Sequence, residues 1–418
     1  MANEIEPSLQ TDTSAPDHAH ARQRSPLHSG GERTMTGYLL SRQEDFDSVP
    51  FNPVDSLILS SISYLNFESY RYESLYGIES VKLIDILRFG DYQTLVHGSW
   101  MDSTDEVSDM LTALARSRRY KDLSVCFYAN ETSEQIEKQF SAATFLLDPK
   151  RAYIAFRGTD GTLTGWKEDF NLSFRTVIPS QTTACLYLSG VLSALPNTAT
   201  VYCGGHSKGG NLAEYAALTI DEGQFNRLER IFNHDGPSFL QDPSPRINDQ
   251  SFQNRLHKTV PESSIFGLIL EKRDDFHVVQ STASLVFQHN PLSWIVTDHD
   301  FLYQDSLNRS AQIFDRTLDR WLQSCTPQQR ELFIDTMFDL LTINEPKNWD
   351  DFQDGLLGNI AAFVYNGVKL DHETKEIILH TFANLRECAN ETVRQQMTKY
   401  LPWLPNGEHR NDSGTIQG

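Results

Sequence analysis

The residues best able to do chemistry lie in Val201–Ala213, where Gly205, Ser207 and Gly209 form the pattern Gly-x-Ser-x-Gly. A nucleophilic serine must stand on a tight turn with its hydroxyl clear of the backbone, and glycines suit its crowded neighbours because they lack a Cβ. The apolar run before the serine and the helix-forming run Leu212–Leu218 after it favour a strand–turn–helix nucleophile elbow. A helix that begins there directs its N–H groups at a developing oxyanion. The bare pattern is also compatible with a glycine-rich turn that holds an ordinary serine.

A nucleophilic serine needs a base, and in α/β-hydrolases the acid and then the histidine follow the serine along the chain. His289 follows the last strand-like segment on a loop, from which a base could reach the carboxyl edge of a sheet. We therefore expect His289 to be the base. His299, between two aspartates, is the second candidate, and we interpret His277, which alternates within a strand, as structural.

The acid that orients the base is expected at Asp235. This residue lies at the end of the strand after the elbow helix, and Gly236-Pro237 follows it. An aspartate that only caps that turn is the other interpretation. Glu262, Asp274 and Asp275 are the alternative acids.

The oxyanion hole is expected to use the backbone N–H of Lys208, the residue after the nucleophile. A second N–H should come from an earlier loop, and Thr159 in Arg157–Gly161 is the candidate. The segment Gly165–Asn171, with Trp166, could form a rim over the cleft. The Lys208 ammonium could attract an anionic substrate, or it could be a solvated or salt-bridged lysine.

The elements that must position these residues alternate along the chain. Strand-like segments are expected at 123–128, 139–147, 152–156, 201–203, 228–232 and 276–279. Helices are expected at 53–65, 81–89, 109–115, 181–195 and after Ser207. Such alternation predicts an α/β fold with a mostly parallel sheet and flanking helices, with a meander of the first three strands at one side. Reactive groups in such sheets gather at the carboxyl ends of the strands.

The chain divides by composition into four parts. Residues 1–34 are polar and are expected to be a disordered tail. Residues 35–300 form the expected hydrolase domain. Residues 301–405 are an expected helical C-terminal region, because the strands stop near Phe301 and apolar residues recur at helical spacing. Residues 406–418 are an expected flexible tail.

Composition narrows the class of protein. The 418-residue chain carries a formal net charge of −20, which argues against binding to nucleic acid because phosphates demand a basic face. Its five cysteines are scattered without a Cys-x-x-Cys pair, so we expect no metal site, no disulfide framework and no cofactor. No signal peptide and no transmembrane segment are expected, and a cytoplasmic location is the default.

Longer motifs carry a family resemblance. Phe156–Thr159, Gly165-Trp166 with Asp169–Asn171, and the elbow through Ala213 resemble the class 3 lipases. With Lys208, the chain resembles a bacterial family of uncharacterised lipase-like hydrolases from about Phe51 to Trp321, through FNPVDSLILSSISYL, HDGPSF, VPESSIFGLIL and QHNPLSW. The resemblance implies an α/β-hydrolase with a Ser–Asp–His arrangement, carried here to Ser207 and His289.

The chain departs from the lipase pattern in two places. Class 3 lipases carry the acid in a loop after a later strand, where this chain reads Pro261–Ile265 without an aspartate, and Lys208 replaces an apolar residue. The sequence therefore predicts a serine hydrolase that cleaves an ester, thioester or related acyl bond of a small-molecule substrate. A non-catalytic scaffold on a hydrolase fold is the alternative, and a peptidase or acyltransferase would use the same residues. The oligomeric state is left open.

Overall fold

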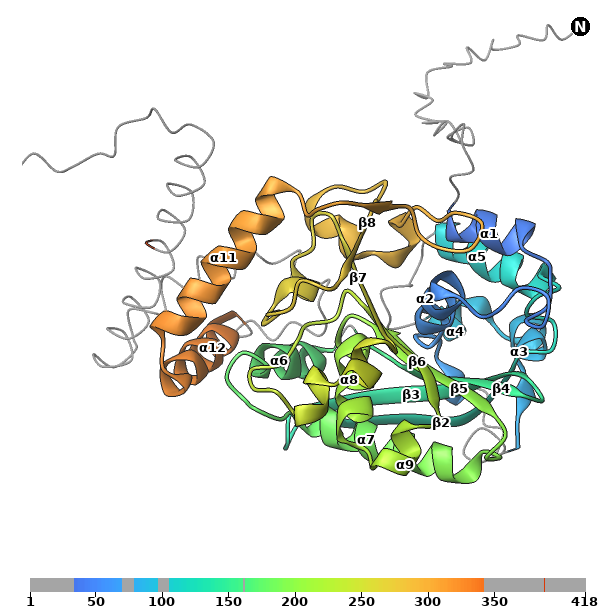
Figure 1. The fold of residues 1–418 in the computed structure, drawn as a ribbon, viewed down its shortest axis with the longest axis horizontal. Helices are drawn as coiled ribbons and strands as arrows, with labels where there is room; N and C mark the ends of the chain where they lie inside the picture. Colours follow the sequence, from blue (N-terminus) through green and yellow to red (C-terminus); the bar gives the residue numbers. More distant parts are fainter. Residues whose placement is uncertain (1–33, 70–78, 97–104, 161, 342–386, 388–418) are drawn as a thin grey trace, which may run out of the picture.

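The computed structural model describes residues 34–69, 79–96, 105–160, 162–341 and 387, and its centre is a nine-stranded sheet (Figure 1). The strands lie side by side in their order along the chain. They are β1 Val81–Lys82, β2 Ser124–Ser133, β3 Lys138–Asp148, β4 Arg151–Phe156, β5 Thr200–His206, β6 Leu228–His234, β7 Leu256–Pro261, β8 His277–Val279 and β9 Tyr303–Gln304.

The sheet is mixed rather than mostly parallel, which corrects the expectation. Strands β4 to β8 run parallel, whereas β1–β4 and the β8–β9 pair are antiparallel. The reason lies in the connections: tight turns join β2, β3 and β4, and such turns impose antiparallel pairing, whereas parallel pairs need a crossover. The expected meander is β2–β4. Three strands were missed: β1, which lies at the start of the helix expected at 81–89, β7, and β9, which lies beyond the residue at which the strands were expected to stop.

Helices cover both faces of this sheet. One face carries α1 Met35–Ser41, α2 Pro53–Ile62, α3 Leu83–Phe89, α4 Tyr92–Val96 and α5 Asp105–Arg116; the other carries α6 Leu163–Asn171, α7 Pro179–Ala194, α8 Lys208–Thr219 and α9 Glu222–Phe225. Phe252 of α10 Gln250–Gln253 belongs to the apolar cluster that α7, α8 and α9 cover. Successive residues of a strand point to opposite faces of a sheet, so the side chains of β4 alternate between two apolar cores. Tyr153 belongs to the same apolar cluster as Ile58 of α2, whereas Ile154 belongs to a second cluster with Leu212 of α8.

A buried ion pair ties the first helices to the body of the domain. Asp55 at the start of α2 accepts hydrogen bonds from Arg119 at 2.6 Å, Tyr120 at 2.5 Å and Tyr38 of α1 at 3.1 Å. Asn52 caps α2 by accepting from the N–H of Val54 and Asp55. No element was expected where α1 lies, because its seven residues are too short for a clear periodic pattern.

The chain after β9 forms two helices, α11 Arg309–Ser324 and α12 Pro327–Leu341. Trp321 and Phe333 of this pair pack with Phe174 and Leu270 in a third apolar cluster. The part of the expected helical C-terminal region at 342–386 and 388–405, and both expected tails apart from Thr34, lie outside the described residues.

The remaining findings concern membrane-spanning helices and the burial of the cysteines. Among the described residues, no helix combines the length and apolar character needed to cross a membrane. The cytoplasmic location stays a prediction. Cys126, Cys203 and Cys325 are buried thiols, and Cys185 is partly buried.

Candidate functional site

Ser207 stands on the turn between β5 and α8 in a strained conformation, with φ 58° and ψ −133°. Positive φ is rare for a residue with a side chain and persists where its surroundings enforce it. Here the Ser207 N–H donates to the His234 carbonyl at 2.9 Å. The flanking glycines permit the turn: a Cβ on Gly205 would lie 2.3 Å from the Gly209 carbonyl carbon, and one on Gly209 would lie 2.1 Å from the Phe156 oxygen.

Asp235 and His289 form a hydrogen-bonded pair. His289 Nδ1 donates to Asp235 Oδ2 at 2.6 Å, so the proton lies on Nδ1 and Nε2 is left as the basic nitrogen. The Asp235 side chain is 1% exposed and that of His289 is 23% exposed. Asp235 follows β6, as the sequence indicated, and its φ of 53° sets the direction of the carboxylate.

A loop after β7 braces Asp235 from the other side. The second carboxylate oxygen of Asp235, Oδ1, accepts hydrogen bonds from Ser264 Oγ at 2.5 Å and from the Gly267 N–H at 3.1 Å. This is the loop in which the resemblance to class 3 lipases placed the acid. In this chain it supplies hydrogen-bond donors to an acid on the neighbouring strand end instead.

The alternative acids and bases lie in other environments. Glu262 accepts from the side chains of Gln288 at 3.1 Å and Gln304 at 2.8 Å. Asp274 and Asp275 are exposed. The two other histidines have separate partners: His299 contacts Arg42 at 3.2 Å, and His277 stacks on His257 with ring centroids 4.7 Å apart.

Gln288, next to the expected base, was missed by sequence reasoning and holds the His289 loop. Its Oε1 accepts from the Ser263 N–H at 2.7 Å, and its Nε2 donates to the Ala283 carbonyl at 3.0 Å. The Trp294 indole donates to the Gln288 carbonyl at 2.8 Å. Gln288 and Trp294 both belong to the motif QHNPLSW. The amide side chain directly before the candidate histidine was therefore the sequence signal that could have indicated the role of Gln288.

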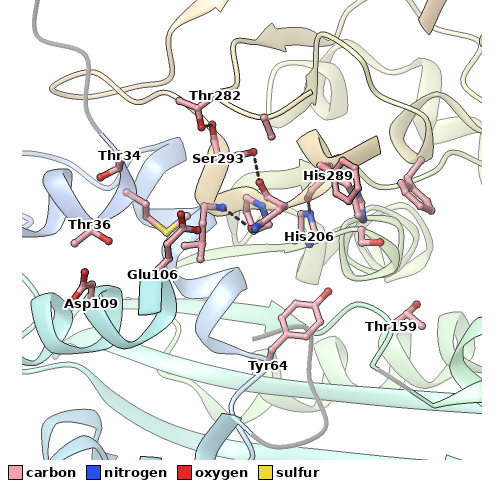
Figure 2. A pocket seen from close by; sticks show the side chains of 18 of the residues that line it. Thr34, Thr36, Tyr64, Glu106, Asp109, Thr159, His206, Thr282, His289 and Ser293 are labelled. Carbon is pink, nitrogen blue, oxygen red and sulfur yellow. Dashed lines mark hydrogen bonds between the residues drawn. The ribbon is translucent and has the colours of Figure 1, made fainter. Parts of the chain in front are cut away.

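His206, the residue before the nucleophile, packs against His289 (Figure 2). The ring centroids are 4.6 Å apart, and His206 Nε2 donates to the His289 carbonyl at 2.9 Å. Burial lowers the pKa of His206 well below its usual range, and repulsion by His289 lowers it further. A neutral His206 therefore anchors the base without adding charge beside it.

The two expected oxyanion donors come from different elements. Lys208 is the first residue of α8, so its N–H is among those that a helix leaves without an intrahelical acceptor. Thr159 follows the carboxyl end of β4, and its hydroxyl donates to Asp169 of α6. Thr159 and Ser207 line the same cavity.

The Lys208 side chain points into the body of the protein. It is 1% exposed and pairs with Glu168 at 3.1 Å, so the salt-bridged interpretation is the one that the geometry supports. An anionic substrate would not reach this ammonium. The ion pair joins the elbow helix α8 to α6.

The site opens into a cavity of about 820 Å³, which has the size of a pocket for a small molecule. Ser207 and His289 line it together with apolar side chains such as Trp166, Phe266 and Phe287. Figure 2 shows Tyr64 and Thr159 across the cavity from Thr282 and Ser293. Of the expected rim, Trp166 and Asp169 line the cavity, whereas Phe170 is 40% exposed.

No group of three or more His, Cys, Asp or Glu in the part of the chain that the structure describes is arranged to hold a metal ion.

Comparisons with known proteins give a family match and a structural match. The model of the Mbeg1-like family matches residues 114–339, more than half of the chain, and this range includes Ser207, Asp235 and His289. No curated protein sequence matches significantly. Among solved structures, the chain is similar to the crystal structure of M37 lipase at 16% identity and a TM-score of 0.32, over 51% of this chain and 68% of that one.

Proposed function

This chain belongs to the Mbeg1-like family, and on that premise we propose that it is a serine hydrolase that cleaves an ester, thioester or related acyl bond. The membership confirms the expectation of an uncharacterised lipase-like family; the bacterial origin stays a prediction. The observation that carries the proposal is the His289–Asp235 hydrogen bond of 2.6 Å beside a cavity that Ser207 and His289 both line.

In the proposed reaction Ser207 Oγ attacks the carbonyl carbon of the substrate, and His289 Nε2 takes the hydroxyl proton. Asp235 holds the ring with Nδ1 protonated and stabilises the imidazolium that forms. The N–H groups of Lys208 and Thr159 bind the oxygen that becomes negative. His289 then gives its proton to the leaving group, and the acyl group stays on Ser207 Oγ. A water molecule, deprotonated by the same histidine, releases the acid and restores the serine.

A fluorophosphonate probe tests this proposal, because it phosphonylates an activated serine, with loss of fluoride, and leaves ordinary serines unlabelled. We expect the wild-type chain to be labelled and Ser207→Ala not to be labelled. Ser193→Ala, an exposed serine on α7, is the control and should be labelled as the wild type is. Circular dichroism verifies that each variant is folded. A folded wild-type chain that resists the probe would contradict the proposal.

The scaffold alternative makes the opposite prediction about phenotype. If the protein acts by binding alone, Ser207→Ala keeps the biological phenotype, and removal of the chain after about Leu302 abolishes it. A hydrolase loses its phenotype in Ser207→Ala at normal protein abundance. The small-molecule acyl substrate is itself part of the proposal, supported by the cavity volume.

A further inference from the structure

The Lys208 side chain is a buried charged group that the proposed reaction does not use. Its Nζ donates to the Gln139 carbonyl at 2.9 Å, to Gln139 Oε1 at 2.7 Å and to Glu168 Oε2 at 3.1 Å. These contacts satisfy all three N–H groups of an ammonium, so its position is fixed. The backbone of the same residue lies beside the nucleophile.

Glu168 has further donors of its own. Its carboxylate accepts from the Gln139 N–H at 2.9 Å, from the Ser180 N–H at 2.9 Å and from Ser180 Oγ at 2.7 Å. The carboxylate is therefore stabilised by three hydrogen bonds besides the ammonium.

A second carboxylate, that of Asp169, lies close to the ammonium on the cavity side. Asp169 Oδ1 is 3.8 Å from Lys208 Nζ, while Oδ2 accepts the hydrogen bond of the Thr159 hydroxyl. Asp169, Thr159 and Ser207 all line the cavity. One carboxylate thus connects the Lys208 ammonium to the loop that supplies the second oxyanion donor.

This placement creates an electrostatic conflict. A carboxylate beside an oxyanion hole opposes the negative charge that develops on the substrate oxygen. Burial raises the pKa of Asp169 to about 6, and Glu168 also raises it. The Lys208 ammonium is the largest influence in the other direction, followed by the Thr159 hydroxyl and then His289.

We propose that the Lys208 ammonium neutralises Asp169, so that this carboxylate holds Thr159 in place without opposing the oxyanion. Lys208 is then a positioning residue whose backbone supplies one oxyanion donor and whose side chain supports the other. This inference rests on the proposed function. A lysine that serves the fold alone would act through Glu168 and would be indifferent to the charge on Asp169.

The test uses the full chain and the rate constant of fluorophosphonate labelling from pH 8 to pH 10, because removing the ammonium raises the pKa of Asp169 and the variants must be compared where this carboxylate is ionised. Lys208→Met alone would leave Glu168 buried without its counter-charge and could unfold the protein. The pair is therefore removed together in Lys208→Met/Glu168→Gln, and Asp169→Asn is added in a triple variant. Asparagine keeps an acceptor for the Thr159 hydroxyl but has no charge.

We expect the double variant to be labelled roughly tenfold to a hundredfold more slowly than the wild type. The triple variant should recover at least about half of that loss on a logarithmic scale, because the uncompensated charge is gone. Lys258→Met/Glu271→Gln removes another buried ion pair, whose side chains are 3% and 2% exposed, and should be labelled at the wild-type rate.

Two results would overturn the inference. One is a double variant that is labelled as fast as the wild type. The other is a triple variant that is no faster than the double variant, which would assign Lys208 to the fold alone. Both results presuppose a labelled wild-type chain, so they are distinguishable from a failure of the proposed hydrolase activity, in which the wild type itself is not labelled.

Discussion

At the scale of single residues, the pairing of Asp235 with His289 is the contact on which the proposed reaction depends most. Asp235 is nearly inaccessible to water and receives three hydrogen bonds, from His289, Ser264 and Gly267. A carboxylate held in this way fixes both the tautomer and the direction of the imidazole. An exposed aspartate could do neither, which distinguishes Asp235 from the alternatives Asp274 and Asp275.

Replacement of the acid should therefore abolish reactivity while sparing the fold. In Asp235→Asn we expect labelling of Ser207 to slow by roughly 10³- to 10⁴-fold, because the amide favours the wrong tautomer of His289. Asp275→Asn is the matched control and should react as the wild type does. Labelling kinetics measure both. An Asp235→Asn variant with wild-type kinetics would remove Asp235 from the mechanism.

Asp169 gives a prediction about stability and pH. Its pKa is about 6 in the folded protein, above the ordinary value of 3.8, because burial disfavours the charge. The folded chain then binds this proton more tightly than the unfolded chain does, so the stability from this group is greatest at low pH. It is lost as the pH rises through about 4 to 6.

The asparagine of Asp169→Asn cannot ionise, so this variant should not lose stability at this position as the pH rises. We expect the free energy of unfolding of Asp169→Asn, relative to that of the wild type, to increase between about pH 4 and pH 7. Urea denaturation at the two pH values measures the difference. The same difference at both pH values would mean that Asp169 keeps an ordinary pKa.

At the scale of elements, the sheet positions the site through the ends of its parallel strands. Ser207 follows β5, Asp235 follows β6, Thr159 follows β4 and the bracing loop follows β7. Because these four strands are parallel neighbours, their carboxyl ends meet at one edge. β8 is also parallel to β7, and the antiparallel strands β1–β3 and β9 extend the sheet on either side.

The loop after β7 should tolerate little change at Gly267, which lies in the short 3₁₀ helix Phe266–Leu268. A Cβ there would lie 2.4 Å from Asp235 Oδ1 and 2.6 Å from Val260 Cγ1. We expect Gly267→Ala to slow labelling of Ser207 by about tenfold or more, because the acid must move.

Gly190 on α7 is the matched control for that substitution. It is exposed, and a Cβ there meets nothing within 4 Å. Gly190→Ala should keep wild-type labelling and raise the free energy of unfolding by about 0.5–1 kcal/mol, because alanine favours the helix. Equal labelling rates of the two variants would show that the loop does not hold the acid.

At the scale of the whole molecule, the helices after the sheet pack as part of one body. Trp321 and Phe333 contact each other edge to face, with centroids 5.6 Å apart, and cluster with Phe174 and Leu270. Lys167 of α6 pairs with Asp335 of α12, and Arg330 donates to the Ser173 carbonyl at 2.8 Å. The element that carries Trp166 and Asp169 is therefore covered by α12.

This packing predicts cooperative unfolding. Trp321 is 6% exposed, and Trp321→Ala should lower the free energy of unfolding by about 3–5 kcal/mol. Leu186→Ala, at a side chain that is 70% exposed on α7, should change it by less than about 0.5 kcal/mol. Calorimetry should show one transition that shifts as a whole in Trp321→Ala. Two transitions, of which only one moves, would mean that α11 and α12 fold separately.

The sequence by itself determined the features that local physics controls. The elbow could be predicted because a strained serine requires glycines beside it. The periodicity of the longer helices and of the strands β2–β6 and β8 likewise predicted those elements. The order of serine, acid and histidine along the chain named Ser207, Asp235 and His289 as candidates before any contact was known.

Only the tertiary structure decided which of the distant residues meet. Glu262 and Asp235 were both available as acids, and the choice depends on the adjacency of β6 and β7 and on a loop that donates to one carboxylate from 29 positions away. The mixed sheet, the Gln288 clamp and the direction of the Lys208 side chain likewise depend on contacts across the chain. Periodicity reports which face of an element is buried, whereas it contains no information about which partner buries it.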